Sequence, residues 1–98
     1  MRTKHQLYTV FLEYRGGTYI SQVRGSSPSA GLSEWSDQLS EKDLMEWSLD
    51  RGQLARIVAA DNLVPLQDRV SVWCLSGVDD HDEQVLINIV ATDDAQQF

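Results

Sequence analysis

The densest group of side chains able to do chemistry is an acidic run that contains one histidine, Asp79, Asp80, His81, Asp82 and Glu83. Carboxylates at close spacing can gather a hard cation such as Ca²⁺. The run lacks the Asp-x-Asp-x-Asp-Gly frame of a calcium loop, and neighbouring residues on an extended loop point in different directions. We therefore expect a solvated turn here, with no metal ligands.

A second candidate is the lone cysteine, Cys74, which could act as a nucleophile if a nearby base lowered its thiol pKa. It lies between Trp73 and Leu75 in an apolar segment, where a free cysteine usually behaves as a small hydrophobic residue. The two histidines, His5 and His81, fall near the start of the chain and in the acidic run. The sequence therefore predicts no catalytic residue and no cofactor, which favours a protein that is not an enzyme without deciding the question.

Aromatic and amide side chains remain as candidates for binding. Tyr19, Trp35 and Trp47 could pack in the core or contact a partner, because such rings bury large areas and keep one polar atom. Asn88 interrupts the apolar segment 85–90 and shares a face with its apolar neighbours at i−2 and i+2. It is either a hydrogen-bonded core amide or part of a surface that faces a ligand or a subunit. These four residues are our candidate interaction residues.

Two hairpins must position these side chains. Residues 7–14 and 18–23 are rich in β-branched and aromatic types, and Gly16-Gly17 between them suits a tight turn. Alternation on the first strand predicts a core face formed by Tyr8, Val10, Leu12 and Tyr14. Residues 70–75 and 85–90 form the second predicted hairpin, joined by the polar loop 76–83.

The middle of the chain has helical spacing. Ser27 followed by Pro28 is a typical helix start, and Ser40 resembles the first residue of a capping box. A third segment begins at Ser48 or Asp50, so the middle holds two helices or one interrupted helix. The order β-β-α-(α)-β-β predicts an α+β fold, a four-stranded antiparallel sheet with the helices packed on one face. The strand order is left open.

Composition bounds the class of protein. The 98 residues are 42% hydrophobic and 23% charged, which predicts a single folded domain over 1–98. The apolar stretches are too short to cross a bilayer and the start does not resemble a secretory signal, so we expect a cytoplasmic protein with no membrane partner.

The charge is uneven along the chain. The formal net charge is −7, yet residues 1–25 carry four basic residues and one acidic residue. An acidic body disfavours nucleic acid and favours a basic protein partner. A homo-oligomer is a further alternative.

One motif carries a family resemblance, Tyr8-x-Val10-x-Leu12-Glu13-x-x-Gly16-Gly17-x-Tyr19-x-x-x-Val23. It resembles the opening hairpin of HicB-type antitoxins, small bacterial proteins that bind and block a partner toxin. That family continues with a short third strand, whereas here Ser26-Ser27-Pro28 leads directly into the predicted helix. The whole chain is also similar to short bacterial proteins without an assigned function, which implies a bacterial origin.

Two functional hypotheses follow from these observations. The first is a small non-enzymatic protein-interaction module of the antitoxin or immunity type. The alternative is a small-ligand-binding protein or enzyme that uses an aromatic-lined pocket at the sheet.

Overall fold

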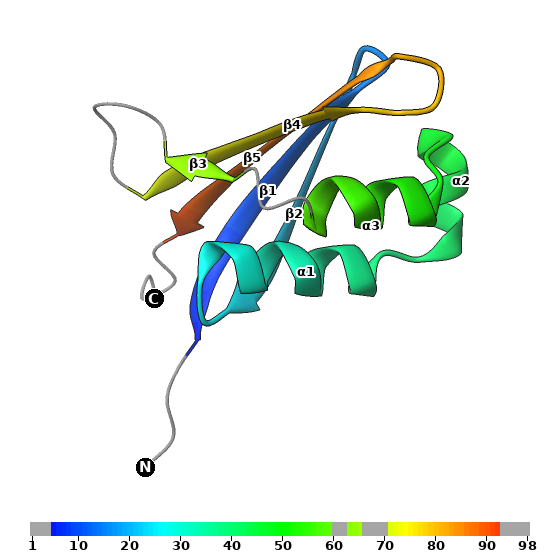
Figure 1. Cartoon of the computed structure of the whole chain (residues 1–98). Helices are drawn as coiled ribbons and strands as arrows, with labels where there is room; N and C mark the ends of the chain where they lie inside the picture. Colours follow the sequence, from blue (N-terminus) through cyan, green and yellow to red (C-terminus); the bar gives the residue numbers. More distant parts are fainter. Residues whose placement is uncertain (1–4, 60–62, 66–70, 93–98) are drawn as a thin grey trace.

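The computed structural model describes residues 5–59, 63–65 and 71–92 and shows an α+β fold with three helices on one face of an antiparallel sheet (Figure 1). The elements in chain order are β1 (Gln6–Tyr14), β2 (Gly17–Gly25), α1 (Pro28–Gln38), α2 (Glu41–Trp47), α3 (Arg51–Ala59), β3 (Val64–Pro65), β4 (Val72–Val78) and β5 (Gln84–Thr92). The predicted fold class and the one-sided helix layer are confirmed.

The sheet has five strands where four were expected, in the order β2-β1-β5-β4-β3. The added strand, β3, is the two-residue segment Val64–Pro65, which pairs with Cys74 and Trp73 of β4. Pro65 reads as a breaker in the sequence, but proline is tolerated on an edge strand. The predicted strand 70–75 begins instead at Val72 in the described chain, and Val70 lies outside the described residues.

The first hairpin turns one residue earlier than expected. Arg15 and Gly16 are its central residues, with φ of 52° and 80°, and Tyr14 pairs with Gly17. The type I′ hairpin turn has positive φ at both central positions, and Arg15 supplies one of them in place of Gly17. Gly17 serves another purpose, because a Cβ there would lie 2.6 Å from the Tyr19 hydroxyl.

The helix starts follow the sequence closely. The Ser27 hydroxyl accepts a hydrogen bond from the Ala30 amide at 3.1 Å, and the Ser40 hydroxyl accepts one from the Asp43 amide at 3.0 Å. The third helix is capped by Asp50, whose Oδ2 accepts from the Gln53 amide at 3.0 Å. These caps therefore begin three separate helices, whereas the sequence had predicted either two helices or one interrupted helix.

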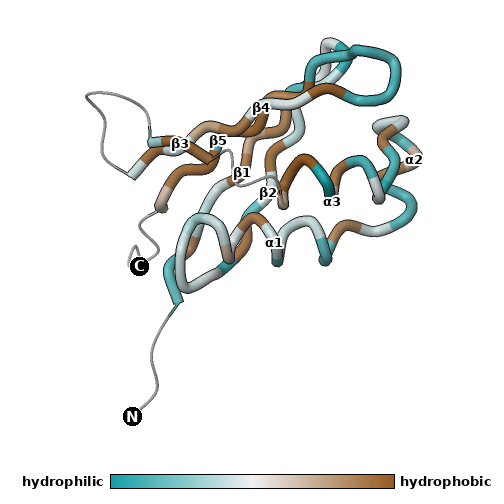
Figure 2. The backbone as a smooth tube through the Cα atoms, in the orientation of Figure 1, coloured by the Kyte–Doolittle hydropathy of each residue, from teal (hydrophilic) through white to brown (hydrophobic). Residues whose placement is uncertain are grey.

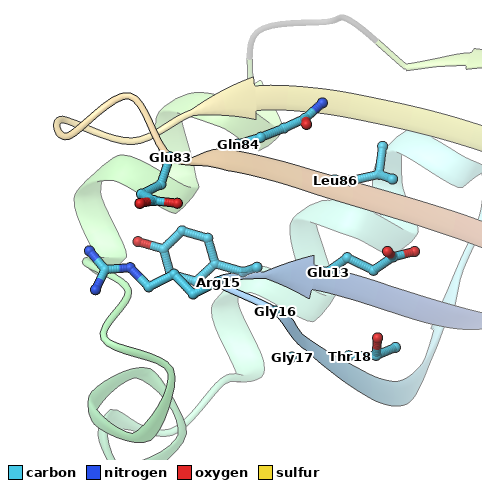
Figure 3. A pocket seen from close by; sticks show the side chains of 9 residues that line it. Glu13, Arg15, Gly16, Gly17, Thr18, Glu83, Gln84 and Leu86 are labelled. Carbon is cyan, nitrogen blue, oxygen red and sulfur yellow. The ribbon is translucent and has the colours of Figure 1, made fainter.

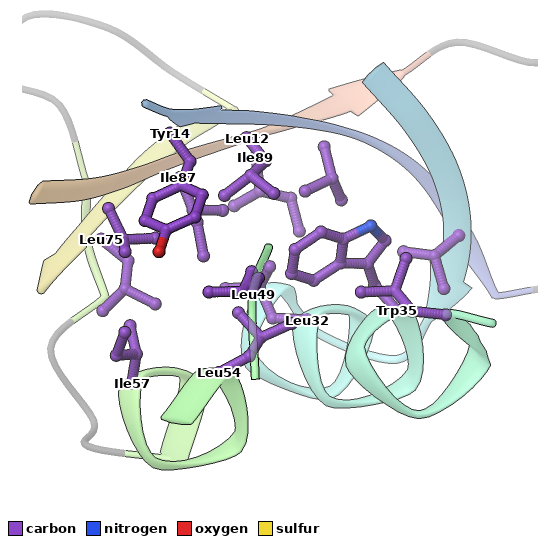
Figure 4. Close-up of a cluster of buried hydrophobic side chains, with 14 of the residues drawn as sticks. Leu12, Tyr14, Leu32, Trp35, Leu49, Leu54, Ile57, Leu75, Ile87 and Ile89 are labelled. Carbon is purple, nitrogen blue, oxygen red and sulfur yellow. The ribbon is translucent and has the colours of Figure 1, made fainter. Parts of the chain in front are cut away.

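The core lies between the helices and the predicted face of β1 (Figure 4). Its fully buried side chains come from β1, β5, β4, α1 and α3: Val10, Leu12, Leu32, Leu54, Leu75, Val85, Ile87 and Ile89. Helix α1 approaches β1 closely at Gly31, where an added Cβ would lie 3.0 Å from the Tyr8 ring. Glycine at position 31 costs about 1 kcal/mol of helix stability relative to alanine, but it allows α1 to pack closely against β1.

Candidate interaction surface

The second face of the sheet carries no helix within the part of the chain that the structure describes (Figure 1). We call it the open face. It is formed by the strand residues that alternate with the core residues, and its apolar members are Leu7, Phe11, Ile20, Val64, Val72, Cys74, Val78, Leu86 and Val90. Hydrophobic residues accordingly run along most of β4 and β5 (Figure 2), where a strand with one wet face would alternate.

One cross-strand row spans the whole open face. Register pairs Ile20 with Phe11, Phe11 with Asn88, Asn88 with Cys74, and Cys74 with Val64. Side chains directly opposite on neighbouring strands lie close enough to contact one another. The row therefore forms one continuous strip in which a single amide stands among apolar groups and a thiol.

The open face is accessible. Ile20, Val78 and Val64 are 63%, 58% and 55% exposed. The apolar residues of its inner strands are partly exposed, and none of the apolar members is buried. Scattered exposed apolar residues are ordinary, but a contiguous apolar patch on a folded domain marks an interaction site.

Asn88 occupies the centre of this face. It is the middle residue of β5, and β5 is the middle strand of the sheet. Its side-chain amide makes no hydrogen bond to any residue in the described ranges. The sequence allowed two environments for Asn88, a hydrogen-bonded position in the core or an exposed surface. The core position is wrong, because Asn88 projects from the face opposite the core.

Charge is nearly absent from the open face. Among the described strand residues that project from it, Glu13 and Arg24 are the charged ones, one of each sign. The acidic residues of the described chain otherwise lie in the helix layer and in the loop between β4 and β5. The preference for a basic partner that the net charge suggested is therefore not a property of this face.

A polar border runs along one end of the face. The Thr9 and Thr92 hydroxyl groups are hydrogen-bonded at 2.6 Å, and the Gln22 amide donates to the Thr9 hydroxyl at 3.2 Å. An apolar centre beside a hydrogen-bonded polar rim is the general anatomy of a protein–protein contact surface.

The other candidate interaction residues lie on the helix side. Trp35 is buried, and its indole N–H donates to the Ser21 hydroxyl at 2.7 Å. The rings of Tyr19 and Trp47 contact each other with centroids 4.9 Å apart, where α2 meets the edge strand β2. These three residues pack helices against the sheet, and only Asn88 of the four belongs to the open face.

The alternative of an aromatic-lined pocket is not supported by this arrangement. Trp35 and Trp47 lie on one face of the sheet and Asn88 lies on the other, so they cannot line one cavity. The structure has a shallow hollow of about 330 Å³ at one end of the open face, between the β1–β2 turn and the start of β5 (Figure 3). Its lining includes Arg15, Thr18 and Glu83, which do not form a nucleophile and base pair.

The acidic run is built differently from the solvated turn we expected. Asp79 is buried, with its Oδ1 accepting from the backbone amides of His81 at 2.8 Å and Glu83 at 2.9 Å. Its Oδ2 accepts from the Tyr14 hydroxyl and lies 3.8 Å from the Arg15 guanidinium. Asp80 points away to accept from the Gln53 amide at 2.7 Å. The carboxylates diverge, and the described residues contain no group of three or more metal-ligand side chains that could hold an ion.

These contacts shift two pKa values in opposite directions. The hydrogen bond from Tyr14, together with those from the two backbone amides, lowers the pKa of Asp79 although burial opposes the shift. Burial and the hydrogen bond to Asp79 raise the pKa of Tyr14. The pair thus keeps its charge on the carboxylate and its proton on the phenol.

The open face was only partly visible in the sequence. Strand one already carries apolar residues on both alternation sets, with Leu7 and Phe11 outside the predicted core face. What sequence reasoning missed is that Ile20, Cys74 and Val64 join Phe11 in one row. The signal in the sequence was that apolar residues occupy both alternating sets of strand positions. These residues can be assigned to one surface only when the strand order is known.

The fold and this surface define a class of protein, a small α+β domain with an antiparallel sheet covered by helices on one face. Comparison of the chain with protein-family models, curated proteins and solved structures gives no match. Within the described ranges, the helices are all too short or too polar to cross a bilayer.

Proposed function

We propose that this chain is a non-enzymatic protein-interaction module that binds its partner through the open face. The observation that carries the proposal is the contiguous apolar row from Ile20 to Val64, exposed at both ends and free of charge. Burying apolar area contributes about 25 cal/mol per Å², so a face of this kind gains free energy when a partner covers it.

The rest of the site agrees with binding and gives no support to catalysis. The perturbed carboxylate, Asp79, is enclosed by hydrogen bonds within the protein, so it is not presented to a substrate. Small proteins of the antitoxin or immunity type need no chemistry of their own, because they act by covering a partner's surface. Membership in that type is part of the proposal and rests on the small size and the accessible face.

The experiment compares which proteins are retained from the native extract by immobilised variants of the chain. Ile20→Asp/Val64→Asp places two charges on the most exposed parts of the row, where the fold depends least on the side chain. Met45→Asp is the matched control. Met45 is 79% exposed on α2, so this substitution also replaces an exposed apolar side chain by a carboxylate, but outside the open face.

We expect one or more proteins to be retained by the wild type and by Met45→Asp but not by the double variant. Circular dichroism and urea unfolding establish that all three chains are folded. Equal retention of the same proteins by the double variant would show that partners bind elsewhere and would refute the proposal.

A further inference from the structure

We infer that the occupant of the open face is a second copy of this chain, packed face to face across a two-fold axis that passes over Asn88. This inference rests on the proposed function of the open face as a contact surface and names the partner. Four observations support it: the position of Asn88, its chemistry, the size of the face and the distribution of charge.

The first observation is the central position of Asn88. In a two-fold dimer the same patch of each subunit meets itself, and a residue on the axis faces its own counterpart. Asn88 is central along its strand and across the sheet. Any two-fold axis that lies between two such faces and crosses their centres therefore places Asn88 opposite the partner's Asn88, whatever the angle between the strands.

The second observation is the chemistry of that residue. A primary amide carries both a donor and an acceptor, so two facing amides can exchange two N–H···O bonds. The amide of Asn88 has no partner among the described residues. An apolar surface of a different protein would bury it unsatisfied, at a cost of about 1 to 3 kcal/mol, whereas a second copy supplies the complementary group.

The third observation is the size of the face. The five strands hold 36 residues, which at about 3.3 Å per residue and about 4.8 Å between strands give a face of roughly 570 Å². Two such faces bury about 1,100 Å², which exceeds the roughly 1,000 Å² that a biological interface is expected to bury. The face is therefore large enough for a small dimer interface.

The fourth observation is the charge. The formal net charge of −7 makes two copies repel each other wherever their acidic surfaces approach. Face-to-face packing leaves both helix layers on the outside of the dimer. An axis that crosses the strands also places the two acidic β4–β5 loops at opposite ends. The nearly neutral open face is thus the surface on which two copies meet with least repulsion.

Sedimentation velocity of the purified chain over a wide concentration range tests the inference. We expect the wild type to change from the mass of one chain to that of two as concentration rises. Asn88→Asp buries two facing carboxylates and should weaken the dimer by about 100-fold or more. Asn88→Val replaces the amide pair by an apolar pair and should remain dimeric, as should the control Met45→Asp.

The double variant Ile20→Asp/Val64→Asp should also be monomeric. It provides a second test if circular dichroism shows that Asn88→Asp is unfolded. A wild type that stays monomeric up to about 500 μM overturns the second copy as occupant. In that case the pull-down still decides whether the open face binds another protein. A dimer that persists in both open-face variants lies on a different surface and also overturns the inference.

Discussion

The hydroxyl of Tyr14 donates a hydrogen bond to Oδ2 of Asp79, which joins the end of β1 to the loop between β4 and β5. The two residues are 65 positions apart in the sequence, and the Arg15 guanidinium lies 3.8 Å from the same carboxylate oxygen. Asp79 also organises its own loop by accepting from two backbone amides. One carboxylate therefore fixes the loop and attaches it to the neighbouring hairpin.

Removing the charge of Asp79 should change the acid stability of the fold. The pKa of Asp79 is lowered in the folded state, so the unfolded chain takes up a proton at higher pH, near its ordinary value of about 3.9. Its stabilising contribution is therefore present above about pH 4 and is lost as the pH falls through the lowered pKa. We expect Asp79→Asn to be less stable than wild type at pH 7, with a difference that shrinks towards pH 3.

Urea unfolding from pH 7 to pH 3 measures this difference. Asp82→Asn is the matched control, because Asp82 lies in the same loop with its side chain exposed, whereas the Tyr14 hydroxyl donates its hydrogen bond to Asp79. The control should follow the wild-type profile. Parallel pH profiles for wild type and Asp79→Asn would contradict a stabilising role for the ionised carboxylate.

Tyr14→Phe should change the alkaline side of the same profile. Because burial and Asp79 raise the pKa of Tyr14, the unfolded chain ionises first as the pH rises above about 10. The contribution of Tyr14 is thus present below that pH and is lost as the pH rises through the raised pKa. The variant should lose less stability than wild type between neutral pH and pH 11.

Burial also raises the pKa of Tyr8, so the alkaline loss should be reduced in Tyr14→Phe and not abolished. Tyr8→Phe is the companion variant, since Tyr8 lies on the same face of β1 and its shift comes from burial alone. Thermal unfolding at pH 7, 10 and 11 measures both. An alkaline loss in Tyr14→Phe as large as in wild type would show that the phenol does not contribute.

A third prediction concerns Arg51, the first residue of α3. Its guanidinium donates to the backbone carbonyls of Ser36 at 3.0 Å and of Leu39, and to the Glu41 carboxylate at 3.0 Å. The carbonyls at the end of a helix have no partner within it, so Arg51 satisfies two of them where α1 ends. We expect Arg51→Ala to reduce the free energy of unfolding by about 1.5 to 3 kcal/mol.

Two companion variants separate the carbonyl contacts from the ion pair. Glu41→Ala removes an exposed ion pair and should cost about 1 kcal/mol or less. Arg51→Lys keeps the charge but loses the planar fork, so it should recover only part of the stability. Urea unfolding is the measurement, and an Arg51→Ala loss no larger than that of Glu41→Ala would assign the whole effect to the ion pair.

Local signals predicted the elements well. The caps at Ser27 and Ser40 and the alternation of β1 depend on residues close in sequence, and the structure confirms them. The turn of the first hairpin was displaced by one residue because Arg15 takes a positive φ that glycine would adopt at lower cost. The choice of turn residues goes with the strand register, in which Tyr14 pairs with Gly17, and a local pattern does not contain that register.

Long-range arrangement could not be predicted in the same way. Nothing near Asn88 in sequence places it beside Phe11 and Cys74, since that neighbourhood depends on β5 lying between β1 and β4. The burial of Asp79 likewise depends on Tyr14, which belongs to a different hairpin. Composition predicted a solvated turn because Asp is common in turns, whereas one of its aspartates became a structural hydrogen-bond acceptor.

The last prediction is that divalent cations do not stabilise the acidic loop. A cation that bound the folded state alone would raise the melting temperature by mass action. Here Asp79 is occupied by Tyr14 and two backbone amides, while Asp80 is directed to Gln53 and lies 3.8 Å from the Arg56 guanidinium. Gathering these carboxylates around one ion would break those contacts, so we expect millimolar Ca²⁺ or Mg²⁺ to leave the melting temperature unchanged relative to chelator.

The comparison variant is Asp80→Asn/Asp82→Asn, which removes two exposed carboxylates and leaves Asp79 in place. Thermal melts of both chains with chelator and with each ion decide the question, because a rise of several degrees in the wild type that the variant lacks would establish a cation site in this loop.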